Sequence, residues 1–293
     1  MLKHILNRIR NIRGKQSSRD WNLIIDQAIK VASVEALTDF CRVESVNYTE
    51  QAYWNWVKLS HSPFAKKRYP DKKALEFFFS AQVLDVQPFD HLLDAAGGHS
   101  GYIDTVRHTT GCQHLYLTDH VYEGVHRDPE GNTIAGGDIS DIALPDESID
   151  RIACHHAFEH FKDEKDIFFI QEIGRLLRPN GRACIIPIFL VNRYAECWNI
   201  DHSGVFDENA ELIIDKTASL PGADVDGHFA RLYNTDAFRR RIINNAEAAC
   251  LTPKIVTCRL DDNDLPDMKK NFGSKLNFPL RALVLEKRKK RAH

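Results

Sequence analysis

The amino-acid sequence predicts an α/β protein with a mostly parallel central sheet, preceded by a helical N-terminal extension. Two observations support this fold class. From residue 91 onward, short apolar segments alternate with helical patterns, as in chains that build parallel sheets. One of these segments, RACIIPIFL at 182–190, is almost entirely apolar, as expected for a strand covered on both faces. The 293 residues, 43 % of them hydrophobic, are enough to bury a full core.

The overall charge and the cysteines narrow the class of protein. The chain has 39 basic and 41 acidic residues, so no global positive field favours nucleic acid, and we expect no nucleic-acid partner. The seven cysteines form no C-x-x-C pair, which favours reduced, buried thiols and a cytoplasmic location. No apolar run reaches the roughly 20 residues that span a bilayer.

The segment before the sheet, residues 1–85, is predicted as a helical extension or lid. Residues 1–15 place apolar side chains on one face with basic flanks, which fits either peripheral contact with the inner face of a membrane or packing on the protein itself. Helices are also predicted over 20–43 and 72–83, the second capped by Asp71. The aromatic residues Tyr53, Trp54 and Trp56 fit a lid or a core equally well.

The rest of the chain, residues 86–290, is predicted to form the sheet domain. Strands are expected at 92–96, 115–119, 132–138, 148–154, 182–190, 254–260 and 281–287, and helices at 102–110, 167–177 and 235–249. Thr235 is the expected N-cap of the last helix. Residues 191–234 lack clear periodicity and are predicted to be an insertion.

A nucleotide-binding arrangement lies at the first two strands. The turn from Asp94 to Gly101 is rich in small residues, and Asp119 ends the next strand 25 positions after Asp94. Such a turn lets a cofactor approach the backbone, and the acidic residue accepts hydrogen bonds from ribose hydroxyls. This arrangement alone does not distinguish NAD from S-adenosylmethionine (SAM).

Four later segments distinguish them. These are GDISDIALPDESID (137–150), RIACHHAFEHF (151–161), EIGRLLRPNG (172–181) and RACIIPIF (182–189). In this order they resemble the class I SAM-dependent methyltransferases, over roughly residues 91–190. The resemblance implies a Rossmann-like, doubly wound, seven-stranded sheet of order 3-2-1-4-5-7-6 with the last strand antiparallel.

The resemblance also implies roles for individual residues. Asp94, Ala96, Gly97 and Gly98 would lie under the methionine part of SAM, and Asp119 would hold the ribose. The adenine would lie against Asp138 and Ile139, and His155 and His156 would line the sulfonium and acceptor side.

Two features depart from the family pattern. Ala96 and Ser100 stand where glycine is usual, so we expect a turn without a strained positive φ. The 12 residues between Asp119 and Asn132 leave little space for the usual helix. A loop carrying His120, Tyr122 and His126 is expected there instead, placed to cover the adenosine.

The histidines of HHAFEH are the candidates for acid–base chemistry. A hydroxyl acceptor must lose a proton, and histidine suits this near neutral pH. His156 is the first candidate, followed by His155 and His160, with Glu159 orienting one of them; His156 also fits a packing role. His156 and His160 lie four apart, but no third ligand is evident, so no metal is expected.

The predicted function is methyl transfer from SAM to a small-molecule or glycan acceptor, most simply by O-methylation. The acceptor pocket is expected outside the core motifs, from the lid or from Tyr194, Trp198, His202, His228 and Arg231. Two alternatives remain open: an NAD-dependent oxidoreductase, although the third glycine of G-x-G-x-x-G is absent, and a SAM-binding scaffold without activity.

Overall fold

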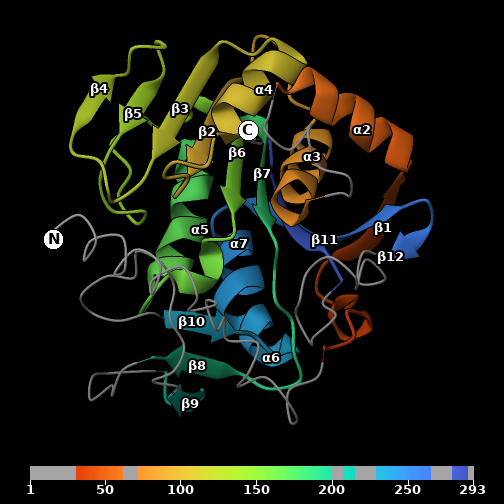
Figure 1. Cartoon of the computed structure of the whole chain (residues 1–293). Coiled ribbons are helices and arrows are strands. Elements are labelled where there is room, and N and C mark those ends of the chain that lie inside the picture. The colour runs from red at the N-terminus through yellow and green to blue at the C-terminus, as the bar shows by residue number, and fades with distance from the viewer. Residues whose placement is uncertain (1–30, 62–70, 200–206, 215–228, 265–278, 290–293) are drawn as a thin grey trace, which may run out of the picture.

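The computed structural model describes residues 31–61, 71–199, 207–214, 229–264 and 279–289 (Figure 1). The predicted amphipathic segment 1–15 and two predicted pocket residues, His202 and His228, lie outside these ranges. All seven cysteines are unpaired, and only Cys250 is exposed. None of the helices in the described residues is both long and apolar enough to cross a membrane.

A large mixed sheet forms the centre of the molecule. Its strands follow the order β1-β11-β13-β7-β6-β2-β3-β5-β4, with β12 paired to β11. The bounds are β1 Arg42–Tyr48, β2 His91–Ala95, β3 His114–Thr118, β4 Val125–Arg127, β5 Thr133–Ala135, β6 Ile149–His155, β7 Leu177–Ile186, β11 Leu251–Leu260, β12 Asn263–Asp264 and β13 Arg281–Lys287.

The seven predicted strands occur in the predicted order, and this confirms the fold class. Read from β5, they run β5-β3-β2-β6-β7-β13-β11, with β13 antiparallel to both of its neighbours. The sheet is larger than predicted because β4 and β1 extend its two edges, which lie on opposite sides of Figure 1. The short connection after β3 contains no helix and folds back as β4, antiparallel to β5.

The N-terminal extension is not purely helical, so that part of the prediction is wrong. Within the described part of residues 20–43, only a 3₁₀ turn forms, η2 at Glu35–Leu37, and β1 begins at Arg42. β1 pairs in parallel with β11, from Arg42 opposite Lys254 to Tyr48 opposite Leu260. The edge of β11 supplies the backbone partners of β1, a long-range pairing that the sequence pattern did not indicate.

Helices cover both faces of the sheet. α2 (Glu50–Leu59), α3 (Lys72–Leu84) and α4 (Tyr102–Thr110) pack on one face. The other face carries α5 (Lys165–Leu176) and a continuous helix made of α6 (Thr235–Phe238), the π-helical η5 (Arg239–Ile243) and α7 (Asn244–Ala248). In β7, Cys184 and Ile186 face the first layer and Ala183 and Ile185 the second, which explains its apolar sequence.

The helix caps show which polar residues begin these helices. Asp71 caps α3 as predicted, accepting hydrogen bonds from the amides of Lys73 and Ala74. The helix that begins with α6 is instead capped by Asn234, whose Oδ1 accepts from the Ala237 amide at 2.8 Å. The predicted cap, Thr235, is therefore the first helical residue.

The insertion forms a small second sheet in its described residues. β10 (Phe229–Leu232), β8 (Ala195–Trp198) and β9 (Glu211–Ile214) pair in the order β10-β8-β9, below the central sheet in Figure 1. β8 and β10 are buried along their whole length. The missing periodicity follows from this burial, since strands covered on both faces do not alternate.

A buried ion cluster joins this small sheet to the first turn of α5. Asp166, which is fully buried, accepts from Arg241 at 2.6 Å and from the hydroxyl of Tyr233 at 2.7 Å, and it lies 3.1 Å from Arg231. Arg231 also pairs with Glu196 of β8 at 2.9 Å. Removing one charged side chain from such a buried cluster leaves the charge of its partner uncompensated.

We expect Arg241→Gln to lower the free energy of unfolding by about 3–5 kcal/mol, because it removes a buried partner of Asp166. Arg240→Gln is the matched control: Arg240 also contacts Asp207, at 3.1 Å, but its side chain is 45 % exposed. The control should cost less than about 1 kcal/mol. Urea denaturation measures both, and equal losses for the two variants would contradict the proposed importance of the cluster.

Candidate active site

The turn after β2 is built around a buried carboxylate. Asp94 is fully buried, and its Oδ2 accepts a hydrogen bond from the Ser100 hydroxyl at 2.8 Å. A Cβ on Gly97 would lie 2.3 Å from that Oδ2 and 2.6 Å from a Leu117 methyl carbon. Only glycine allows the backbone at position 97 to pass this close to Asp94.

The turn is strained, contrary to the expectation of an unstrained one. Ala96 has a φ of +53°, in the left-handed region, followed by Gly98 at +49°. For a residue with a Cβ this conformation costs about 1–2 kcal/mol. The chain must reverse directly above Asp94, and the hydrogen bond from Ser100 fixes the far end of the reversal. Ala96 therefore adopts the conformation that glycine provides in the family.

Asp119 lies across the sheet edge from this turn. It directly follows β3, and its Oδ1 accepts from the Val121 amide at 3.1 Å. Its Oδ2 lies 3.3 Å from where a Cβ would stand on Gly98. The structure thus brings together the glycine turn and the acidic residue that the sequence paired.

The loop after Asp119 lies over the turn. The Tyr122 hydroxyl donates to the carbonyl oxygen of Gly98 at 3.0 Å, and the Tyr122 ring contacts that of His99. His120 lies 3.2 Å from Asp119, whereas His126 lies within β4 and is exposed. Of the three predicted loop residues, Tyr122 is the one that contacts the turn.

Asp138 already has protein partners. Its Oδ1 accepts from the amide and hydroxyl of Ser140, at 2.9 and 2.7 Å, and its Oδ2 pairs with Lys165 at 2.6 Å. Partial burial opposes ionisation, but these hydrogen bonds outweigh it and lower the pKa of Asp138 to about 2. Ile139 is 9 % exposed and packs in the core. Asp138 is therefore a charged acceptor at the protein surface.

His155 is the last residue of β6 and is enclosed by aromatic rings. Its ring lies 4.9 Å from that of Phe77 and 4.2 Å from that of Tyr102, measured between centroids. Its Nδ1 is 3.5 Å from Asp94 Oδ1, too far for a hydrogen bond, and neither ring nitrogen has a partner. Asp94 Oδ1 also has none, so two complementary groups meet without satisfying each other.

His156 and Glu159 form an ion pair at the end of β6. His156 Nδ1 lies 2.7 Å from Glu159 Oε1, with the histidine side chain 44 % exposed and the glutamate 7 % exposed. Partial burial disfavours the charged imidazole, but Glu159 outweighs it and raises the pKa of His156. Burial likewise disfavours the Glu159 carboxylate, but His156 and His160 lower its pKa to about 2. His156 has a φ of +52°, so the backbone turns sharply here.

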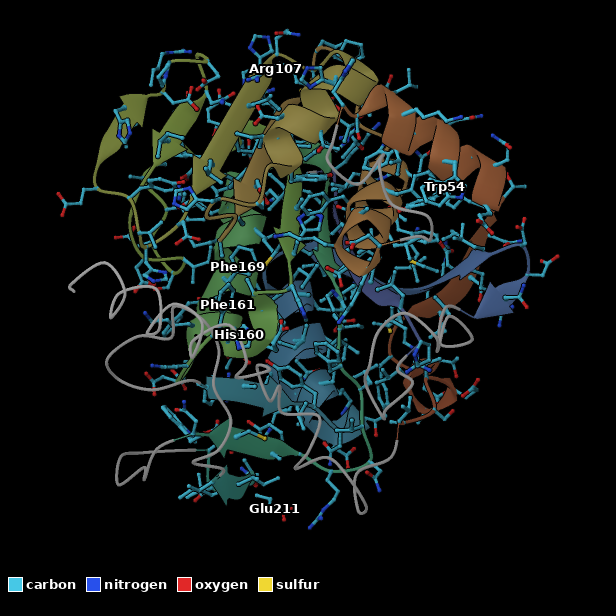
Figure 2. The ribbon with its side chains drawn as sticks, in the orientation of Figure 1. Trp54, Arg107, His160, Phe161, Phe169 and Glu211 are labelled. Carbon is cyan, nitrogen blue, oxygen red and sulfur yellow. The ribbon has the colours of Figure 1, made fainter. Side chains whose placement is uncertain are left out.

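His160 has a different contact from His156. Its Nδ1 lies 2.6 Å from the carbonyl oxygen of Phe229, and because a carbonyl only accepts, Nδ1 must donate. Its Nε2 lies 3.8 Å from Glu159 Oε1. His160 thus ties η4 (Phe158–His160) to β10, and Figure 2 shows it next to Phe161 and Phe169, beside α5.

Glu76 of α3 was not predicted as a site residue. It is 1 % exposed, its Oε1 has no hydrogen-bond partner, and burial raises its pKa. The charges that act on it include those of His156, His155 and Glu159. The available sequence signal was a single carboxylate within the apolar helix segment ALEFFFSA.

A small hollow lies beside Glu159, between η4, the end of β7 and β10. It is lined by Phe158, Glu159, Pro187, Ile188, Phe189, Arg231, Tyr233 and Phe238. The second oxygen of Glu159 is buried without a partner. The hollow is therefore lined mainly by apolar and aromatic side chains, together with the charged Glu159 and Arg231.

Most of the other residues predicted for the acceptor pocket are packing residues. Tyr53 and Trp56 are buried against Phe78. Trp54, also on α2, lies at the upper right of Figure 2, away from His160. Trp198 packs on Phe229, and Tyr194 is stacked on Tyr233. Of the predicted pocket residues that the structure describes, Arg231 lines the hollow, with its guanidinium held by the ion cluster.

Comparison with known proteins identifies the domain. Residues 93–185 match the family model of the methyltransferase domain. This segment contains the turn, Asp119, Asp138 and the HHAFEH residues. Residues 93–185 are therefore similar to a methyltransferase domain, which is consistent with the class I SAM-dependent methyltransferases that the motifs indicated. No curated protein matches the sequence.

Several solved structures are similar. They include a SAM-dependent methyltransferase from Mesorhizobium loti (14 % identity, 73 % of this chain and 98 % of that chain covered, TM-score 0.48). Another is a chain from the complex between the Haloferax volcanii Trm112 methyltransferase activator and a methyltransferase. It has 14 % identity, covers 83 % of this chain and 97 % of that chain, and has a TM-score of 0.48. A third is the Burkholderia thailandensis 1,6-didemethyltoxoflavin-N1-methyltransferase with 1,6-didemethyltoxoflavin and S-adenosylhomocysteine bound. It has 15 % identity, covers 82 % of this chain and 90 % of that chain, and has a TM-score of 0.45.

The residues at the turn fit SAM, the cofactor of this class of domain. The missing side chain of Gly97 lets the turn pack directly on Asp94, and Asp94 Oδ1 is a buried acceptor without a donor. No group of three or more histidine, cysteine, aspartate or glutamate side chains is placed to hold a metal in the described residues. The acceptor groups at the turn thus suit an organic ligand that brings hydrogen-bond donors.

We expect Gly97→Ala to weaken SAM binding by about tenfold or more, because relieving the overlap with Asp94 costs about 1–3 kcal/mol. Gly111→Ala is the control: Gly111 ends α4 with a φ of +76° and has its nearest atom at 3.9 Å. It should lower stability and leave binding unchanged. Isothermal titration calorimetry measures both, and an unaffected Gly97→Ala would show that the turn does not hold the cofactor.

Proposed function

We propose that this domain methylates a hydroxyl group of a small-molecule or glycan acceptor, with His156 as the general base. One observation supports this best: an accessible imidazole is paired at 2.7 Å with a buried carboxylate, at the carboxyl end of a central strand. Ligands of open α/β sheets bind at this end of the strands. The pair has the geometry of a base oriented by a neighbouring acid.

The cofactor would occupy the turn side of this edge. In this proposal Asp94, Ala96, Gly97 and Gly98 lie against the methionine part of SAM, Asp119 holds the ribose hydroxyls, and Asp138 and Ile139 lie near the adenine. Asp138 retains acceptor capacity, because a carboxylate has about four lone-pair sites and its three present donors leave one. When bound, SAM supplies an electrophilic methyl group.

The protein supplies the proton acceptor. With Nδ1 directed to Glu159, neutral His156 presents Nε2 as the basic nitrogen. Nε2 would take the acceptor's hydroxyl proton, and the Glu159 carboxylate would stabilise the imidazolium that forms. His160 is a weaker candidate because it is anchored to Phe229, and His155 because it is buried beside Asp94.

The acceptor would lie over the hollow beside Glu159. Its aromatic lining suits the apolar face of a sugar or a flat ring, and the unpartnered oxygen of Glu159 can accept one ligand donor. Positioning there matters because orientation alone supplies on the order of 7–11 kcal/mol in well-aligned reactions.

The direct test measures SAM turnover against fractionated metabolites and lipid-linked glycans of the source cell. We expect one fraction to accept a methyl group, and His156→Ala to lower kcat by about 10²–10⁴-fold, the usual contribution of a general base. His114→Ala is the control and should retain activity, because His114 begins β3 and the proposed site lies at the carboxyl ends of the strands. SAM binding without turnover on any fraction would favour a silent scaffold.

The pH dependence tests the His156–Glu159 pair. A base must be deprotonated, and Glu159 keeps the pKa of His156 raised, so kcat/KM should fall on the acid side at a pH above that of an ordinary histidine. Glu159→Gln removes the stabilising charge and should move this acid limb to lower pH. A pH–rate profile of both proteins decides, and an unmoved limb in Glu159→Gln would refute His156 as the base.

A further inference from the structure

We propose that the Glu76 carboxylate accepts a hydrogen bond from an ammonium group of a bound ligand. Two ligands can bring such a group: SAM, through its methionine ammonium, or an acceptor that carries an amine. This inference goes beyond the proposed reaction because it concerns ligand recognition by α3 and not proton transfer. It extends the site to an element outside the 93–185 domain match.

The position of Glu76 directs it toward the site. Its neighbour Phe77 contacts the ring of His155, and Ser80, one helical turn further on, lies 3.3 Å from the Tyr102 hydroxyl. Glu76 and Ser80 share a face of α3, since residues four apart are neighbours on a helix. That face packs against β6 and β7, and Glu76 lies on it one turn closer to the start of α3.

In the part of the chain that the structure describes, Glu76 Oε1 has no hydrogen-bond donor. The side chain is 1 % exposed, and Oε1 has no hydrogen-bond partner among protein groups. Burying a carboxylate without a donor is costly, and the raised pKa of Glu76 reflects that cost. His156, Lys72 and His155 oppose this rise by their charges, and Glu159 adds to it. A ligand that donates to Glu76 would remove the penalty.

The surroundings favour a cationic donor. Three carboxylates at this edge each keep one buried oxygen without a partner: Glu76 Oε1, Asp94 Oδ1 and Glu159 Oε2. Carboxylates only accept, so these three oxygens require donors from a ligand, and the three groups add negative charge to the site. Hydrogen bonds between charged groups are the stronger kind, which makes an ammonium the best match.

Calorimetry on the full chain tests the proposal with two probes, S-adenosylhomocysteine and 5′-methylthioadenosine, which lacks the amino-acid part. If the methionine ammonium is the donor, Glu76→Gln should weaken S-adenosylhomocysteine binding by roughly 10–100-fold and leave 5′-methylthioadenosine unchanged. Ser80→Ala, on the same buried face, is the matched control and should affect neither probe. Equal weakening of both probes would overturn the proposal in favour of a structural role.

A second arm, which rests on the acceptor class proposed above, tests an acceptor amine. If S-adenosylhomocysteine binding is unchanged in Glu76→Gln, the wild-type complex with S-adenosylhomocysteine should still be stabilised more by glucosamine than by N-acetylglucosamine in a thermal shift. The variant should lose this difference. No difference in either protein, together with unchanged cofactor binding, overturns the proposal. Cofactor binding is measured without turnover, so failure of the hydroxyl chemistry does not affect the first arm.

The stability of the ligand-free protein separates recognition from structure. Because Glu76 is a buried acceptor without a donor, Glu76→Gln should raise the melting temperature, by about 2 °C or more for each kcal/mol recovered. A carboxylate with a structural role would lower it when replaced. A lower melting temperature together with unchanged ligand binding would overturn the proposal.

Discussion

The buried charge of Asp166 is the constraint on which the arrangement of the site depends. A fully buried carboxylate needs compensating partners. Here they are Arg231 on β10, Tyr233 directly after β10, and Arg241 in the helix that begins with α6. The same two arginines donate to backbone carbonyls at Phe161 and Asp163, directly after η4. The cluster thus fastens the insertion, the C-terminal helix and the segment carrying Glu159 and His160 to one point. The proposed His156–Glu159 pair adjoins this segment, so the cluster helps to hold its glutamate in place.

The fully partnered cluster contrasts with the carboxyl edge of the central strands. Asp166 has a donor for each oxygen, whereas Glu76, Asp94 and Glu159 each keep a buried oxygen without one. Native proteins satisfy nearly all buried polar atoms, so orphans gathered in one place indicate a place for ligand donors. Two of the ten non-glycine residues with positive φ in the described part of the chain, Ala96 and His156, also lie at this edge. Such strain persists only where surrounding structure enforces it, and this edge is where a ligand would benefit from it.

The sequence predicted the central sheet well because its evidence was local. A strand covered on both faces is apolar at every position, as at residues 182–186, and motif spacing placed Asp94 and Asp119 at one edge. The prediction from sequence failed where pairing between distant segments determined the secondary structure. The segment at residues 42–48 becomes a strand because it pairs with β11, 212 residues further along the chain, as the partners Val43 and Ile255, or Val46 and Cys258, illustrate. The sequence did not predict the positive φ of Ala96, because this conformation arises from the packing of the turn on Asp94. Conformational propensity alone predicted an unstrained turn.

Glu76 shows why a charged residue in an apolar helix deserves a functional interpretation. From sequence, a lone carboxylate among phenylalanines suggests either a solvated position or an ion pair, and the structure provides neither. Evolution could have placed leucine there at a gain in stability, since an unsatisfied buried carboxylate opposes folding. Retaining it is consistent with a benefit outside folding, and the histidine pair that its charge reaches indicates where that benefit lies. The same argument applies to Asp94, whose Oδ1 lies 3.5 Å from His155 Nδ1 and has no hydrogen-bond partner in the described residues.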